Sequence, residues 1–175
     1  MMGFRATAAA LVVAAFALSG CAPSTPAASG AVRCDGGTLN VSVSPALGNE
    51  VRETSAALSN TPNPVGCDDR TGAGITSAQV SALTLDFPGV SYYQFLDAVG
   101  AGPATIKWSD GTSSSATVTA SFSSNAPWSF DVKVDSGALA GYSASAPFWL
   151  SSIAGNSDGI TAFAASFGDL TFTQS

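Results

Sequence analysis

Cysteine is the residue type in this chain that points most directly to chemistry, because histidine is absent from all 175 positions. The cysteines are Cys21, Cys34 and Cys67, and no two of them have the Cys-x-x-Cys spacing of a zinc site. Without histidine, nucleophilic catalysis by a Ser–His or Cys–His pair is excluded in its usual form. We therefore expect neither a bound metal nor a cofactor.

The charged residues also give little support for an enzyme. The only lysines, Lys107 and Lys133, occupy polar positions of alternating segments, where a side chain faces solvent rather than a serine nucleophile. Asp131 and Asp135 flank one such segment and are expected on its solvent face and in a turn, not as a glycosidase-like pair. Asp68-Asp69 has two interpretations, a weak Ca²⁺ site and a polar loop, of which the polar loop is favoured. The sequence predicts a protein that is not an enzyme.

Composition sets the broad class. Hydrophobic residues make up 46% of the chain and charged residues 10%, which is enough apolar surface for a core and unlike a disordered segment. There are 6 basic and 12 acidic residues, for a net charge of −6, with no run of basic residues. Because phosphate binding needs clustered lysine and arginine, we expect no nucleic-acid partner.

Residues 1–20 have the features of a secretory signal peptide. Arg5 supplies the positive start, and the apolar stretch 6–18 is too short for a bilayer span of about 20 residues. The stretch ends in Leu18-Ser19-Gly20-Cys21, which resembles the bacterial lipobox Leu-[Ala/Ser]-[Gly/Ala]-Cys at every position. This resemblance implies that the Cys21 thiolate accepts a diacylglyceryl group as a thioether. Cleavage between Gly20 and Cys21 then leaves the lipidated cysteine as the first residue.

The alternative is an ordinary signal peptide, with Cys21 as an incidental free thiol. Lipidation is favoured because it leaves an even pair of cysteines for a disulfide. Residues 21–32, the lipidated cysteine and a stretch rich in Pro, Ser and Ala, are typical of a flexible tether with a reach of about 20 Å. We expect a cell-membrane protein, held by palmitate-like acyl chains on the extracytoplasmic face.

Residues 33–175 are predicted to form one domain with one disulfide. Cys34 and Cys67 are expected to pair because an exported chain meets an oxidising compartment. Closing the loop between them should contribute roughly 3–4 kcal/mol in the chain-entropy model.

Apolar and small polar residues alternate along this domain with the period of half-buried strands. One run, 80–87, changes phase at a point that a bulge would explain. Segment 91–99 is ambiguous and favours a strand over a short helical turn. Turns are expected at 109–112, at 135–137 and at 156–159. The predicted strands fall at 39–43, 80–87, 104–108, 116–122, 128–134, 142–150, 160–167 and 170–172. Together these features predict an all-β fold, an antiparallel β-sandwich or β-barrel of about eight to ten short strands.

The large aromatic residues have two interpretations. The favoured one places them in the core; in the other, some line a barrel interior or sheet face that binds an apolar ligand or a glycan. Tyr92-Tyr93 is expected to be exposed, or else to cap the core. The other aromatic residues considered are Trp108, Trp128, Trp149, Phe163, Phe167 and Phe172.

The segment Thr105–Ser114, with Trp108-Ser109-Asp110-Gly111 at its centre, resembles a group of uncharacterised secreted proteins of actinobacteria. Cys34–Thr38 followed by Ser44–Leu47 and a second cysteine at Cys67, and Val134–Gly141, are similar to further parts of that group. The similar segments extend over most of residues 34–172, although many members carry more cysteines. The resemblance implies a compact all-β fold and an exported location, and it carries no activity.

These features predict a membrane-anchored extracytoplasmic lipoprotein whose β domain is a non-catalytic interaction or envelope module. Its partner, a protein, a glycan or a lipid, is not specified by the sequence. Such a module predicts a filled interior and an exposed apolar patch. The alternative is a carrier of a small apolar ligand or lipid in a β-barrel cavity, which predicts an internal pocket of several hundred cubic ångströms.

Overall fold

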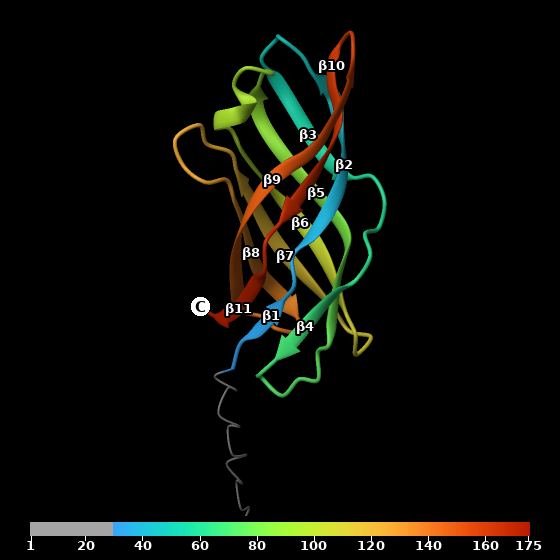
Figure 1. Ribbon diagram of the computed structural model, residues 1–175, viewed down its shortest axis with the longest axis vertical. Helices are drawn as coiled ribbons and strands as arrows, with labels where there is room; N and C mark the ends of the chain where they lie inside the picture. Colours follow the sequence, from blue (N-terminus) through green and yellow to red (C-terminus); the bar gives the residue numbers. More distant parts are fainter. Residues whose placement is uncertain (1–29) are drawn as a thin grey trace, which may run out of the picture.

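The structure, a computed structural model, describes residues 30–175 and is built almost entirely of antiparallel strands (Figure 1). The predicted all-β class is confirmed, with eleven strands rather than eight to ten. The strands are β1 (Val32–Cys34), β2 (Gly37–Leu47), β3 (Arg52–Leu58), β4 (Val65–Asp69), β5 (Ser77–Val90), β6 (Val99–Trp108), β7 (Ser113–Ser121), β8 (Ser129–Gly137), β9 (Tyr142–Asn156), β10 (Gly159–Phe167) and β11 (Leu170–Gln174).

The sheet closes on itself, which decides between a sandwich and a barrel. Successive ladders join β10, β2, β3, β5, β6, β7, β8 and β9, and β9 pairs again with β10. The short strands β4, β1 and β11 form a second connection between β5 and β9 at one end of this ring. Closure leaves the eight main strands without a free edge along most of their length.

Alternation in the sequence explains which side chains fill the barrel. In β7, for example, Ala116, Val118 and Ala120 are buried while the residues between them face solvent or are half-buried. The strands β2, β6, β8 and β9 follow the same pattern. The predicted change of phase in β5 is confirmed, because its ladder with β6 shifts register between Val80 and Ala82.

The disulfide fastens the end of the barrel at which the described chain begins. Cys34 and Cys67 lie opposite each other in the β1–β4 ladder and are bonded, as predicted. β1 begins at Val32, which is fully buried, so this last residue of the predicted tether already belongs to the barrel. Residue 30 and the C-terminus both lie at this end, which we call the base (Figure 1).

Two of the three predicted turns lie where they were expected. At 109–112, Gly111 has φ of +84°, and the Asp110 carboxylate accepts hydrogen bonds from the N–H and hydroxyl of Thr112. A turn at Ser157–Asp158 likewise joins β9 and β10. The prediction at 135–137 was wrong: these residues extend β8, whose ladder shifts register beside Ser115 and Ala116, and the chain reverses at 138–141.

The ambiguous segment 91–99 was wrongly predicted to be a strand. It forms a turn and a short 3₁₀ helix, η1 (Phe95–Asp97), at the end of the barrel opposite the base, which we call the distal end (Figure 1). Phe95 points inward, with its ring centroid 4.4 Å from that of Phe122 and 5.7 Å from that of Phe163. The segment therefore closes the distal end, and a single apolar side chain provides the closure.

Aromatic rings fill the distal half of the barrel behind Phe95. Phe122, Phe148 and Trp128 pack with centroids 5.0 to 5.6 Å apart. Four of the aromatic residues predicted in the core are buried: Trp108, Phe163, Phe167 and Phe172. Trp128 is partly buried, whereas the prediction for Trp149 was wrong, because it lies on the outer face of β9 and is 52% exposed.

Candidate functional site

The distal end carries most of the exposed large apolar side chains. Tyr93 is 74% exposed, which confirms the expected exposure of the Tyr92-Tyr93 pair. These residues come from the β2–β3 turn, the 91–98 segment, the start of β6 and the end of β9. We call the set the distal patch: Val51, Tyr92, Tyr93, Leu96, Val99 and Ile153.

A ring contact and two shared hollows connect four members of the distal patch. The Tyr92 and Tyr93 rings meet edge to face with centroids 5.5 Å apart. Tyr93 and Val99 line one shallow hollow, while Tyr92 and Ile153 line another beside the β9–β10 hairpin. A backbone hydrogen bond from Tyr92 N–H to Gly48 O, at 2.7 Å, fastens the tyrosine segment to the β2–β3 turn. The exposed rings are therefore presented on a folded support.

Acidic side chains surround the distal patch. Glu50 and Asp158 are exposed in the neighbouring turns. Asp97 accepts a 2.6 Å hydrogen bond from the Ser124 N–H, and this bond lowers the pKa of the carboxyl group. The nearby cation, Arg52, donates to the Ala46 carbonyl oxygen at 2.6 Å. The rim of the patch thus has negative character.

The distal half of the barrel interior is filled. A hollow in this half has a volume of about 20 Å³ and an entirely apolar lining that includes Leu83, Phe122 and Phe163. A volume of this size holds about one water molecule. Of the aromatic residues with these two interpretations, Trp108 and Phe163 pack the core, whereas Phe167 and Phe172 are buried and also line the pocket described next.

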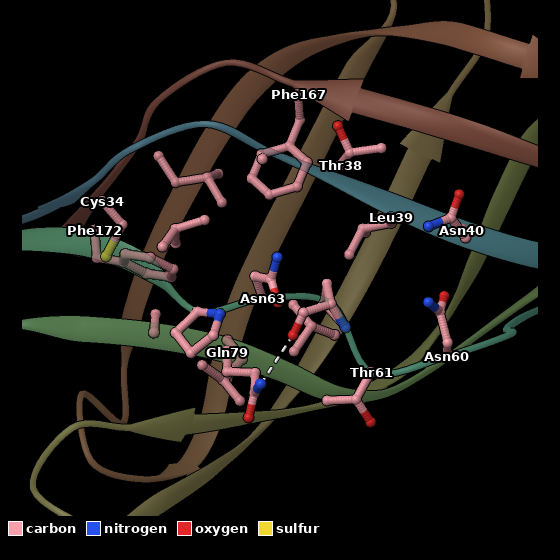
Figure 2. A pocket seen from close by; sticks show the side chains of 18 residues that line it. Cys34, Thr38, Leu39, Asn40, Asn60, Thr61, Asn63, Gln79, Phe167 and Phe172 are labelled. Atoms are coloured by element: carbon pink, nitrogen blue, oxygen red, sulfur yellow. Dashed lines mark hydrogen bonds between the residues drawn. The ribbon is translucent and has the colours of Figure 1, made fainter.

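A separate pocket of about 430 Å³ opens through the barrel wall between β2 and β5 (Figure 2). Residues 59–64, which we call the strap, cross this opening on the way from β3 to β4. Leu39 and Phe167 lie on the inner side, and Asn40, Asn60 and Asn63 lie toward the mouth. A pocket of this size was expected only under the carrier alternative, and two aromatic residues considered there, Phe167 and Phe172, line it. The position of this side pocket in the barrel wall was not predicted.

The residues considered for catalysis do not come together. Lys107 and Lys133 are exposed, as expected. Asp135 accepts a 2.7 Å hydrogen bond from the Thr117 hydroxyl, and Asp131 accepts one from the Ser129 hydroxyl, so both acids lie on the solvent face of the sheet. In residues 30–175 no group of three His, Cys, Asp or Glu side chains is arranged to hold a metal ion.

Asp69 organises the loop that follows β4. One carboxylate oxygen accepts hydrogen bonds from the N–H and hydroxyl of Thr71, and the other accepts from the N–H groups of Gly74 and Ile75. Partial burial acts to raise the pKa of Asp69, but these hydrogen bonds outweigh it and hold the pKa below its ordinary value. This satisfied carboxylate supports the polar-loop interpretation of Asp68-Asp69.

The predicted lipidation and cleavage residues, Cys21 and Gly20, and the signal peptide 1–20 lie outside the described residues. Within the described part of the chain, no helix has the length and apolar character needed to cross a membrane. No family model, curated protein or solved structure matches this sequence.

Proposed function

We propose that this chain is a lipid-anchored extracytoplasmic protein whose barrel is a non-catalytic interaction module with the distal patch as its binding surface. The observation that carries the proposal is one of position. Most of the exposed large apolar side chains belong to the distal end. The tether joins the barrel at residue 30, at the opposite end (Figure 1).

Position matters because a lipid at Cys21 would hold the base of the barrel near the membrane. The tether allows a separation of about 20 Å, which is short enough to keep the base closer to the headgroups than the distal end. The distal patch then faces away from the membrane. A soluble domain gains nothing from exposed tyrosine, leucine and isoleucine side chains on a structured end, whereas an interface gains affinity from them.

The residues in and around the distal patch indicate the chemical character of its partner. Tyrosine offers a large apolar area and a hydroxyl group at a small entropic cost, which suits recognition of another macromolecule. Because Glu50, Asp97 and Asp158 lie around the patch, a complementary partner presents apolar groups bordered by neutral or basic ones.

Transport of an apolar ligand inside the barrel has less support. A carrier needs a cavity of several hundred cubic ångströms that encloses its ligand. The hollow in the distal half has about 20 Å³, and the side pocket of about 430 Å³ opens to solvent through the barrel wall. Phe95 also closes the distal mouth of the barrel. A catalytic role lacks support as well, since the lysines and acids considered for it lie apart on the solvent face.

Site-specific photocrosslinking in intact cells tests the proposed surface. Tyr93→p-benzoylphenylalanine places the reactive group on the patch, and Ala140→p-benzoylphenylalanine places it in an exposed turn at the base as a matched control. We expect irradiation to give a discrete adduct from position 93 and none from position 140. Equal adducts from both positions, or none from position 93, would contradict the proposal.

Two polar substitutions provide the second control. Because Tyr93 and Leu96 are exposed, the variant Tyr93→Ser/Leu96→Ser should retain the urea unfolding midpoint of the parent chain. A neighbouring reporter, Val99→p-benzoylphenylalanine, should lose its adduct in this background if the apolar side chains carry the binding. Persistence of that adduct would show that the patch is not the interface.

A further inference from the structure

The side pocket exists because β3 stops pairing with β2 and β5 before the ladder between β4 and β5 begins. β2 pairs with β3 only from Val41 to Ser44, so residues 37–40 of β2 have a partner on one side alone, in β10. Along β5, the β3 ladder stops at Thr84 and the β4 ladder covers Ser77 and Ala78. Residues 79–83 therefore pair only with β6 in the described sheet. The wall is open between these two stretches.

The strap bridges this opening without completing the sheet. The Ser59 N–H donates to the Asn40 carbonyl oxygen at 2.8 Å, and the Gln79 side chain donates to the Pro62 carbonyl oxygen at 2.8 Å (Figure 2). Pro62 and Pro64 have no N–H to offer a ladder, so the strap cannot act as another strand. The disulfide at Cys67 fixes the chain shortly after the strap. The strap therefore narrows the opening without closing it.

The lining of the side pocket combines an apolar floor with an uncharged polar mouth. Leu39, Ile106 and Phe172 contribute to the floor. Carboxamides of three exposed asparagines lie around the mouth: Asn40, Asn60 and Asn63. Their side-chain amides make no hydrogen bond to any residue in 30–175, so both their donors and their acceptors are free for a ligand.

The charge of the pocket lining determines which ligands the side pocket favours. Among residues 30–175, no Asp, Glu, Lys or Arg lines the side pocket. An ion entering it would lose hydration without gaining a countercharge, which is costly. Carboxamides, by contrast, pair with neutral amide, hydroxyl or amine groups, and the floor accommodates a ring or chain.

We infer that the side pocket binds a small uncharged molecule that has an apolar body and a hydrogen-bonding edge. A volume of about 430 Å³ falls within the range of small-molecule sites. The apolar body lies against the Leu39 and Phe172 side of the pocket, and the polar edge meets the asparagine amides at the mouth. This inference does not depend on the distal patch or on the lipid anchor.

Two dyes with the same aromatic skeleton test the inference. N-phenyl-1-naphthylamine is neutral and carries one N–H, whereas 8-anilino-1-naphthalenesulfonate adds a sulfonate. The chain of residues 21–175 with Cys21→Ser is suitable, because the buried core of the described structure lies within residues 32–172. We expect saturable 1:1 fluorescence enhancement with the neutral dye and affinity weaker by about tenfold or more for the anionic one.

Substitutions at Asn63 locate the binding. Asn63 is exposed and lies over the pocket, so Asn63→Trp should fill the opening and weaken binding of the neutral dye by about tenfold or more. The matched control Asn125→Trp makes the same change in the exposed loop between β7 and β8 and should leave the dissociation constant unchanged. Asn63→Arg should strengthen binding of the sulfonate dye by severalfold, a gain that misfolding cannot produce.

Three results would overturn the inference. One is the absence of saturable binding of the neutral dye. Another is equal binding of that dye by the Asn63→Trp and Asn125→Trp chains. The third is loss of binding in the Tyr93→Ser/Leu96→Ser variant, which would place the dye on the distal patch instead.

Discussion

Ser114 is an example of a polar residue that the core accommodates because all its partners are present. It is 1% exposed and accepts a 2.8 Å hydrogen bond from the Trp108 indole N–H. Its own hydroxyl donates to the Ala138 carbonyl oxygen. Three segments, the end of β6, the start of β7 and the turn after β8, are thus joined through one hydroxyl group, which is how a buried polar group avoids the cost of lost hydration.

Asp69 leads to a prediction about acid sensitivity. Its folded-state pKa is lowered, so the unfolded chain binds its proton more readily. The stabilisation that Asp69 provides is therefore fully present above its unfolded pKa, near 3.9, and is lost as pH falls through the lower folded pKa. We expect the difference in unfolding free energy between the parent and Asp69→Asn, about 1 kcal/mol at pH 7, to shrink between pH 5 and pH 2.

Urea unfolding at several pH values measures this difference. Asp68→Asn is the matched control, because Asp68 is exposed, forms a surface ion pair with Arg70 and should change stability little at any pH. A difference for Asp69→Asn that stays constant from pH 7 to pH 2 would show that the carboxylate form is not what organises the loop.

At the scale of elements, η1 is the part of the fold whose role depends on a single side chain. Phe95 is 4% exposed and contacts rings from β5, β10 and the residue after β7, while Leu96 beside it is 49% exposed. Phe95→Ala should lower the unfolding free energy by about 3–5 kcal/mol, because it removes buried area and leaves a cavity.

Thermal or urea unfolding compares this variant with Leu96→Ala, which changes the next residue and should cost less than about 1 kcal/mol. Similar losses for both variants would mean that η1 does not close the barrel in the way described. A loss confined to Phe95→Ala would support the assignment of the 91–98 segment as a plug.

Whether a strand could be predicted from the sequence depended on the residue types at its inward-facing positions. In β2 and β7 these are Leu, Val and Ala in strict alternation, so the strands were evident. β3 was missed because its inward positions include Thr54, which is buried with no partner for its hydroxyl in the described chain, and Ala56. Neither residue produces a strong apolar period.

The position of the side pocket was beyond prediction for a different reason. It arises from the register at which β3 leaves β2, near Leu58, and register is a property of pairing between distant segments. The segment Ser59–Pro64 reads simply as a polar loop with two prolines. Segment 91–99 was misjudged because its tyrosines and phenylalanine suit a strand, while a closed barrel needs a cap at its end.

At the scale of the whole molecule, the two ends of the barrel differ in kind. The base combines the chain entry, the disulfide and the C-terminus, whereas the distal end combines loops with exposed apolar side chains (Figure 1). A barrel whose two ends differ in this way presents its distal end outward if its base is held at a membrane surface. Cys21 is the residue proposed to hold it there.

Mass spectrometry of the N-terminal peptide, from protein purified out of the membrane fraction, tests this account most directly. We predict that the mature chain begins at Cys21 and that its thiol carries a diacylglyceryl group, while a Cys21→Ser chain yields no such peptide. A mature chain that begins elsewhere, or an N-terminal Cys21 with a free thiol, would contradict lipid anchoring at the base of the barrel.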